Sequence, residues 1–265
     1  MFQEPASTPI DIRFRLFRTA VRIHPLFWVI ALLFGRNRFD DPDKSMAIWV
    51  FALFISILIH EFGHIIAMRN LDDDGYIVLH AFGGLAISTK RLHRTPKEMI
   101  QVALAGPIAG FILIVIIYVV TQLLGAELQG FYYGVTGWEI IEFAIPQFYV
   151  YDLGMLRLDE GVIPLATQAV IWTHINDLIV TLSVINILWG LLNLVPVFPL
   201  DGGQTVMGIF SLSNPQTGQV EALRVSLVVG AMISIVAVFV LQELYLGIMF
   251  GFLAFQSYQM LNSPY

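Results

Sequence analysis

Long apolar segments recur along the 265-residue chain, and six of them are candidates to cross a lipid bilayer. Apolar side chains make up 57% of the sequence and charged ones only 13%, whereas a soluble domain carries about a quarter charged residues. About 20 apolar residues cross the hydrocarbon layer as a helix. The sequence therefore predicts an all-α polytopic membrane protein with about six transmembrane helices, at residues 23–35, 45–68, 99–124, 169–195, 222–241 and 244–261.

The first of these segments is short for a span and follows four arginines. A positive region before an apolar stretch is typical of a signal peptide. The small-x-small cleavage site is missing, however, because Phe34-Gly35-Arg36-Asn37 follows. We interpret the segment as a retained first span that is tilted or partly sheltered by protein, with a cleaved signal peptide as the alternative.

Three stretches between or before the spans favour other structures. Residues 10–17 alternate between apolar and polar, which indicates a short amphipathic strand at the membrane surface. Residues 76–79 and 85–88 flank a Gly83-Gly84 turn and predict a short membrane-associated β-hairpin between the second and third spans. The mixed aromatic and acidic segment 125–167 is expected to be partly helical and bound at the interface.

Charge patterning predicts an orientation and excludes some partners. Six spans place both termini on one side, and an inner N-terminus puts ten of the 14 Lys and Arg residues inside. Cytoplasmic loops carry the positive excess, so both termini are expected in the cytoplasm. The net charge is −6 and no basic run is present, which argues against nucleic acid as a partner. Cysteine is absent, which leaves histidines and carboxylates as metal ligands.

The second span carries His60-Glu61-Phe62-Gly63-His64 in its final third. Residues four apart share one face of a helix, so His60 and His64 can reach one zinc ion. Glu61 beside them can act as general base on a metal-bound water. Ionisable side chains are expensive in an apolar helix, and a divalent cation compensates them. The alternative is a polar cluster that hydrogen-bonds neighbouring helices without metal.

A catalytic zinc site needs a third protein ligand at the same depth. The candidates on or next to the fourth span are His174, Asp177 and Asp201. Asp177 lies sixteen residues before Asn193, about 24 Å along a helix, and His174 lies farther still. Asp201 is at the inner end, where the second span also presents its motif.

The residues around Asp201 favour a broken backbone that aims this carboxylate into the bundle. Pro196 and Pro199 end the helix before it, and Gly202-Gly203 permit a tight turn. Irregular backbone at membrane depth is tolerated where it is buried in protein or lines a cavity. An ordinary cap for a helix that starts at Gly202 is the alternative role for Asp201.

The paired motifs resemble those of the site-2 protease family of intramembrane zinc metalloproteases: His60-Glu61-Phe62-Gly63-His64 with Asn193-x-x-Pro196-x-x-x-x-Asp201-Gly202, and Ala105-Gly106-Pro107, similar to the Gly-Pro element of that family. The resemblance covers residues 45–205. It implies zinc ligands at His60, His64 and Asp201, a catalytic base at Glu61, and hydrolysis of a membrane-tethered substrate in or near its transmembrane segment. It implies one membrane-embedded protease domain over residues 1–265, into which neither a PDZ domain nor a CBS pair fits.

Three further expectations concern the surroundings of this site. The Asn193 amide either helps to bind substrate and stabilise the oxyanion or makes an interhelical hydrogen bond. The hairpin 76–88 either shields the site or holds the unwound substrate as an added strand. His24 and His80 are expected at the membrane interface.

Two functions from other classes compete with intramembrane proteolysis. A metal or proton transporter predicts polar residues along a whole path and an inverted repeat, but the polar residues here concentrate at one depth. A non-catalytic scaffold that binds membrane helices predicts a dispensable Glu61. Co²⁺ or Mn²⁺ can satisfy the same ligands as Zn²⁺.

Overall fold

The structure is a computed structural model that describes residues 4–36, 45–90, 94–124, 127–135, 138–147 and 165–262. Its seven helices within these ranges are α1 (Pro25–Phe34), α2 (Met46–Arg69), α3 (Pro96–Leu123), α4 (Leu165–Asn193), α5 (Asp201–Ser213), α6 (Gly218–Phe239) and α7 (Leu244–Asn262). Five of them are long and apolar enough to cross a membrane: α2, α3, the Thr173–Asn193 part of α4, α6 and α7.

The surface of α3 shows how such a helix meets lipid. Large apolar side chains at Ile108, Ile112, Val115 and Val119 are all more than 45% exposed. Their spacing places them along one stripe of the helix. A stripe of this kind is a membrane-facing surface, because soluble monomers rarely expose contiguous apolar patches of such length.

The first predicted span is helical but shorter than expected. The ten residues of α1 cover about 15 Å, half of the hydrocarbon layer. Arg69 at the end of α2 donates to Thr19 Oγ1 at 2.9 Å, whereas Trp49 near its start donates to the Ala31 carbonyl at 2.8 Å. Residues 19–31 therefore run alongside α2, from its C-terminal end to near its N-terminal end. A strand and a short helix together make this passage instead of one long helix.

A small four-stranded sheet in the order β1-β2-β3-β4 supports the helices. It contains β1 (Ile12–Leu16), β2 (Thr19–Ile23), β3 (Gly75–His80) and β4 (Gly83–Ser88). β1 and β2, like β3 and β4, pair antiparallel, and β2 and β3 pair parallel with Val21 opposite Ile77. The structure confirms the predicted β3–β4 hairpin and the first strand. The predicted turn at Gly83-Gly84 is wrong, because both glycines pair with β3 as the first residues of β4 and the turn is at residues 81–82. It adds β2, whose five residues merge in sequence with the apolar segment that follows.

The expectation of partly helical structure between α3 and α4 is wrong for residues 127–147. They form an antiparallel hairpin of β5 (Glu127–Val135) and β6 (Trp138–Gln147). Aromatic and β-branched residues recur in both strands, and these residue types favour strands. The remainder of this prediction, at residues 148–164, lies outside the described residues.

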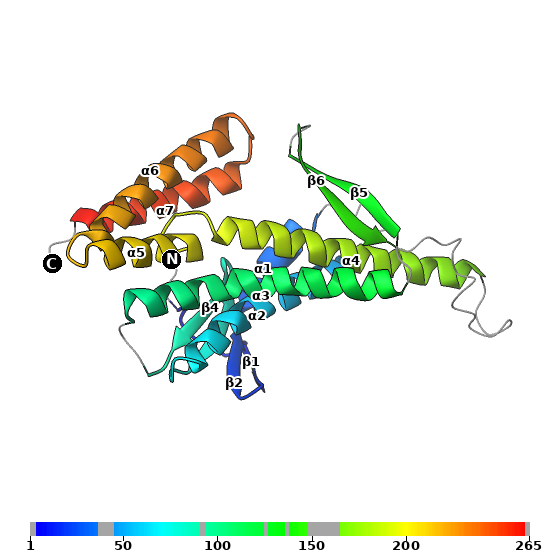
Figure 1. Cartoon of the computed structure of the whole chain (residues 1–265). Coiled ribbons are helices and arrows are strands. Elements are labelled where there is room, and N and C mark those ends of the chain that lie inside the picture. Colours follow the sequence, from blue (N-terminus) through cyan, green and yellow to red (C-terminus); the bar gives the residue numbers. More distant parts are fainter. Residues whose placement is uncertain are drawn as a thin grey trace.

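The helix α2 packs on the sheet and on α3, and α3 in turn packs on α5. α3 and α4 lie side by side across the middle of the molecule, and the α6–α7 pair packs beyond α5 (Figure 1). The largest core joins the sheet to α1, α2 and α4 through buried residues such as Val21, Ile77, Ile57, Ile65 and Ile185. This packing buries the face of α2 that carries both histidines.

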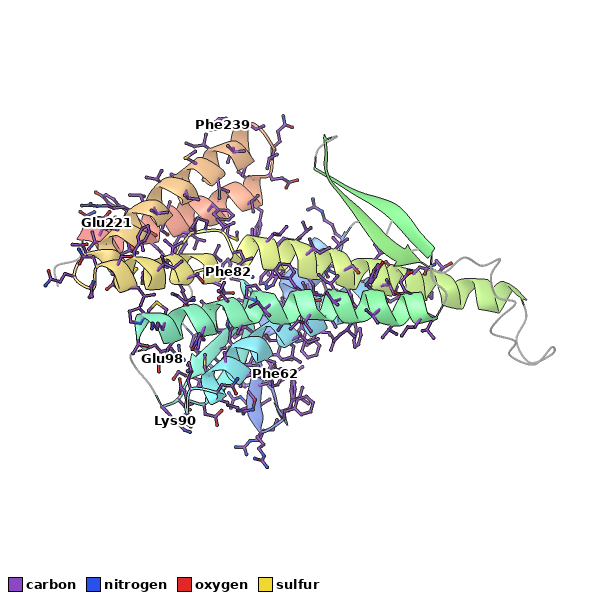
Figure 2. All side chains as sticks on the ribbon, viewed as in Figure 1. Phe62, Phe82, Lys90, Glu98, Glu221 and Phe239 are labelled. Atoms are coloured by element: carbon purple, nitrogen blue, oxygen red, sulfur yellow. The ribbon has the colours of Figure 1, made fainter. Side chains whose placement is uncertain are left out.

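Charged residues mark one end of this bundle. Glu98 lies in the first turn of α3, Glu221 in the first turn of α6, and Lys90 follows β4. All three lie at the same end of the molecule, whereas Phe239, at the end of α6, lies at the top of the view (Figure 2). An array of apolar helices with charges collected at one end fits a bilayer and its interface.

Candidate metal centre

The second helix presents the first two candidate ligands on its buried face. His60 and His64 are 4% and 7% exposed and lie one helical turn apart on α2. Their Nε2 atoms are 3.2 Å from each other. The predicted convergence of the two imidazoles is thus present in the structure, at a depth where water is scarce.

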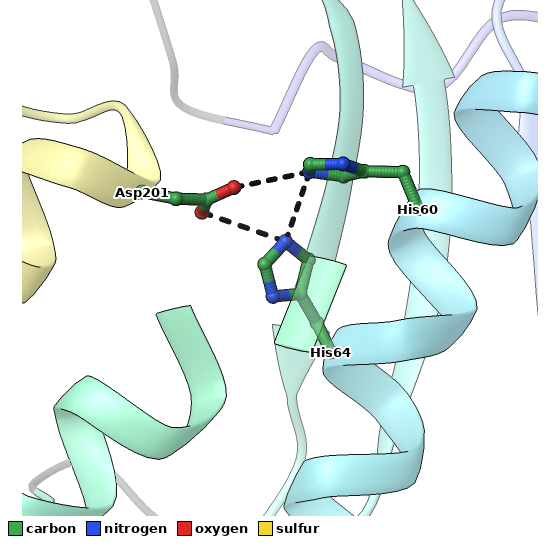
Figure 3. A group of neighbouring side chains, drawn as sticks. All are labelled: His60, His64 and Asp201. Carbon is green, nitrogen blue, oxygen red and sulfur yellow. Dashed lines mark hydrogen bonds and ion pairs between the residues drawn. The ribbon is translucent and has the colours of Figure 1, made fainter. Parts of the chain in front are cut away.

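The Asp201 carboxylate faces both imidazoles from a separate helix (Figure 3). Its Oδ2 lies 3.0 Å from His60 Nε2, and its Oδ1 lies 3.4 Å from His64 Nε2. Asp201 is the first residue of α5, and Leu200 occupies the cap position without a side-chain hydrogen bond. The alternative role of Asp201 as a helix cap is therefore wrong.

These three groups fit a zinc ion in both spacing and chemistry. One atom from each lies within 4.8 Å of the other two. Ligands at about 2.0–2.1 Å in a tetrahedron are roughly 3.3 Å apart, close to the separations observed. Within the described part of the chain Asp201 Oδ2 accepts no well-aligned hydrogen bond, although it is buried and lies 3.0 Å from His60 Nε2. An unpaired carboxylate oxygen beside two ring nitrogens is what a shared cation would satisfy.

The tautomer of His64 is set by a neighbouring helix. His64 Nδ1 lies 2.7 Å from the main-chain carbonyl of Val102 in α3. A carbonyl oxygen can only accept, so Nδ1 carries the proton and donates it. Nε2 is left with its lone pair toward the centre, which is the form that binds a metal.

The chain between α4 and α5 bends back on itself to place Asp201. The last helical residue of α4 is Asn193, and residues 194–200 are irregular. A side chain at Gly202 would collide with the Leu194 carbonyl, and one at Gly203 with the Phe198 amide. The two glycines therefore let the irregular segment lie directly on the first turn of α5. The predicted helix break is present, and the glycines serve close packing rather than a turn.

Gly106 in α3 provides the space in which the imidazoles meet. A Cβ at this position would collide with His64 Nε2 and would lie 2.7 Å from His60 Nε2. Gly63, between the two histidines, has the same relation to α3, because its Cβ would collide with the Ala105 carbonyl. Small residues such as those of Ala105-Gly106-Pro107 let neighbouring helices approach closely, but the sequence does not place Gly106 against the candidate ligands.

Glu61 lies beside the centre and opens into the same cavity. It is 4% exposed, and a Cβ at Gly84 in β4 would lie 2.5 Å from its Oε1. The cavity has a volume of about 290 Å³ and is lined by all three candidate ligands, by Glu61 and by Asn193. It extends to α1 and α7, where the Phe34 and Tyr245 rings meet edge to face with centroids 4.9 Å apart.

The remaining candidates occupy other positions. Asn193 lines the cavity, and its Nδ2 donates to the Trp189 carbonyl within α4 at 3.0 Å. Its second N–H faces no interhelical acceptor given by the described residues. Asp177 accepts from the Ser45 amide at the start of α2, fifteen residues and about 22 Å before His60. Asp177 is therefore excluded as a ligand, as its depth along α4 predicts.

Comparison with known proteins places this geometry in a family. The sequence profile of peptidase family M50 matches residues 48–237. The chain belongs to peptidase family M50. A zinc metalloprotease from Methanocaldococcus jannaschii is 23% identical over 225 residues, which cover 84% of this chain and 51% of that protein. A putative zinc metalloprotease from Synechocystis sp. is 28% identical over 206 residues, or 73% of this chain and 42% of that protein.

This M50 chain thus spans about half the length of the curated relatives it matches. A solved site-2 protease from M. jannaschii superposes with a TM-score of 0.53 at 20% identity, over 96% of this chain and 97% of that one. The two share a fold. The resemblance to the site-2 protease family is confirmed, and the apolar helices of this M50 chain make it an integral multi-pass membrane protein.

One histidine lies elsewhere than expected. His80 at the end of β3 is 5% exposed and lines the cavity of the metal centre, so its assignment to the membrane interface is wrong. The strand pairing Leu79–Gly84 brings the end of β3 beside Glu61, which no local pattern reveals. His24 accepts from the Leu26 amide as the cap of α1.

A buried carboxylate anchors the β3–β4 hairpin to α3. Asp73 accepts from Ser88 Oγ at 2.8 Å and from the Arg94 guanidinium at 2.9 Å. Burial alone would raise the pKa of Asp73, but these two donors and the Asp74 amide together hold the pKa below its ordinary value. The ion pair fixes the end of β4 next to the start of α3, and Arg94 also lines the cavity.

Proposed function

We propose that this chain is an intramembrane zinc endopeptidase that hydrolyses peptide bonds in or near transmembrane segments of membrane-tethered substrates. One observation carries the proposal: two imidazoles and a carboxylate converge to 3.0–3.4 Å beside a buried glutamate. Membership of family M50 and the names of the metalloprotease relatives support the same reaction and the same metal.

In this proposal His60, His64 and Asp201 hold the zinc ion. When bound, zinc supplies a Lewis acid for the scissile carbonyl and lowers the pKa of a coordinated water to about 7. The Val102 carbonyl keeps His64 in the ligating tautomer. Gly106 keeps the space between the rings open.

Glu61 is the proton carrier of the reaction. Its carboxylate accepts the proton of the attacking water and returns it to the leaving amine. Gly84 leaves room for this carboxylate against β4. Asn193 lines the same cavity, and its free amide N–H is suited to hydrogen-bond the developing oxyanion.

The edge of the sheet offers a way to hold the substrate. A peptide bond inside a helix is shielded, so the segment to be cut must unwind before attack. β4 is the last strand of the sheet, and the described residues provide no partner on its other side. Because Gly84 of β4 touches Glu61, a substrate strand added to this edge by main-chain hydrogen bonds would lie next to the base.

The orientation of the chain follows from its charges. We place the sheet end of α2 at the cytoplasmic side, because most Lys and Arg residues fall there when the N-terminus is inside. The passage from Thr19 to Ala31 along α2 supports a first crossing, and hence an even number of crossings with both termini in the cytoplasm. Cleavage then takes place nearer the cytoplasmic face.

The test combines metal content with cleavage. Elemental analysis of the purified wild type and of Glu61→Gln is expected to find about one zinc per chain in each, since Glu61 is not a ligand. Only the wild type should cleave a model transmembrane substrate. His60→Ala should lose both zinc and cleavage. Cleavage that survives Glu61→Gln would refute the role of Glu61 as the base, whereas a wild type without metal and without cleavage would refute the protease and favour the scaffold or transporter.

A further inference from the structure

Two buried N–H donors in the cavity of the metal centre have no hydrogen-bond partner among the residues that the structure describes. They are Nε2 of His80 and Nε1 of Trp189. Both residues line the cavity that also contains Glu61 and Asp201. Buried donors are nearly always paired, so an unpaired pair in one cavity calls for an acceptor that is bound there.

The hydrogen bond at the other ring nitrogen makes His80 Nε2 a donor. The Phe82 amide N–H lies 3.3 Å from His80 Nδ1, and an amide N–H can only donate. Nδ1 therefore accepts, and the proton of the neutral ring is on Nε2. Burial, with a smaller contribution from nearby positive groups that include His24, lowers the pKa of His80 to about 4. The ring is neutral at physiological pH and offers one N–H.

Gly83 brings the two donors together. It pairs with His80 across the β3–β4 ladder. A Cβ on Gly83 would lie 2.6 Å from Cζ2 and 2.7 Å from Cη2 of the Trp189 indole, so the edge of the ring lies against Gly83, next to the turn. The turn itself, which includes Phe82, lies at the centre of the molecule between the helices (Figure 2). His80 and Trp189 thus both adjoin Gly83, the first residue of β4, which directly precedes the Gly84 that touches Glu61.

We infer that His80 and Trp189 form a donor pair that binds main-chain carbonyls of the unwound substrate. The inference rests on the proposed protease function. Side-chain acceptors are scarce in apolar transmembrane segments, whereas a carbonyl recurs at every residue. A segment that leaves its helix in an apolar cavity must find new donors for these carbonyls. Neutral donors suit this task because they carry no charge to desolvate.

Paired variants separate donation from packing. In His80→Asn the side-chain oxygen can take the place of Nδ1 and accept from Phe82, but no N–H reaches the position of Nε2. In His80→Gln the amide N–H reaches that position. Trp189→Phe keeps an aromatic side chain at this position and removes the N–H together with part of the indole edge that meets Gly83. Each is made in zinc-loaded, full-length Glu61→Gln, which binds substrate without cutting it.

The measurement is the Kd of a fluorescent transmembrane peptide, the model substrate of the cleavage assay, in bilayer nanodiscs. His80→Asn and Trp189→Phe are each expected to raise the Kd about five- to tenfold, the value of one hydrogen bond. His80→Gln should stay within about twofold of its parent. Zinc content and Tm should be unchanged in all three, because neither residue is a ligand.

The inference is overturned if either His80→Asn or Trp189→Phe binds the peptide as tightly as Glu61→Gln. It is also overturned if His80→Gln is as weak as His80→Asn, since the loss would then reflect the ring and not its proton. Binding does not require hydrolysis. A wild type that fails to cut would therefore refute the protease while the Kd ratios still decide the role of the donors.

Discussion

Replacement of Gly106 by alanine should disable the metal centre while leaving the fold intact. The added methyl would collide with His64 Nε2, and it would lie 2.6 Å from His64 Cε1 and 2.7 Å from His60 Nε2. Contacts below 3.0 Å essentially never occur, so the imidazoles or the helix must move. α3 cannot easily retreat, because Gly63 of α2 packs directly on the Ala105 carbonyl.

The expected loss of zinc affinity follows from how little a metal site tolerates displacement of its ligands. Metal–ligand distances hold within about 0.2 Å. The added methyl group would lie 2.7 Å from His60 Nε2, so the imidazole would have to move by about 0.2 Å or more to relieve the contact. Disturbing the shell around a metal site typically costs 10–100-fold in affinity, or about 1.4–2.8 kcal/mol. Alanine also favours a helix over glycine by about 1 kcal/mol, so a loss of zinc should not reflect a loss of helix.

The assay is zinc affinity by chelator competition, with cleavage of the transmembrane substrate measured alongside. Gly110→Ala is the matched control: it lies one turn farther along α3, and its Cβ would meet Asn186 Oδ1 at 3.2 Å and no candidate ligand. Gly110→Ala should keep wild-type zinc affinity. If Gly106→Ala binds zinc and cuts as the wild type does, the imidazoles do not occupy the positions described.

Three further changes test the supports of the site. Because the pKa of Asp73 is held low in the fold, its contribution to stability is present above about pH 4 and is lost as the pH falls through the lowered pKa. Asp73→Asn should cost about 1–3 kcal/mol at neutral pH and flatten the acid limb of the unfolding curve. Asn186→Leu removes a buried 2.8 Å bond to Ser56 and should cost about 0.6–1.7 kcal/mol, with little further loss in a double variant with Ser56→Ala. Asp177→Ala removes the acceptor of the amide of Ser45, the cap residue of α2, and should lower stability by about 1 kcal/mol in detergent unfolding, without changing zinc content.

The candidate ligands can be predicted from sequence because the two histidines form a local motif and because an acidic residue at membrane depth is chemically unusual. The spacing of His60 and His64 places them on one helix face whatever the rest of the fold does. An acidic residue after two prolines at the end of a span is also rare in an apolar chain. Depth along the helices then separates Asp201 from Asp177, and in the structure Asp201 lies beside the two imidazoles whereas Asp177 lies near the start of α2.

Features that depend on pairing between distant segments are not predictable in this way. β2 is five residues long, and it becomes a strand because β1 and β3 lie on either side of it. The predicted first span, residues 23–35, therefore begins where β2 ends and covers only the helical part of the passage that β2 makes with α1. Similarly, aromatic residues at 127–147 suit an interfacial helix or a hairpin, and only the pairing of β5 with β6 decides between them.

Glycines surround the centre because its side chains must converge in a small space. Gly63, Gly84 and Gly106 come from α2, β4 and α3, and each would place a Cβ against a neighbouring backbone or a side chain of the centre. A tetrahedral site needs three helices and a strand within a few ångströms, which ordinary side chains prevent. Each glycine costs helix or strand propensity, and it is retained here because the ligands must converge. Where a glycine motif lies on a helix beside a metal motif, its role is therefore better sought in the space it leaves open than in backbone flexibility.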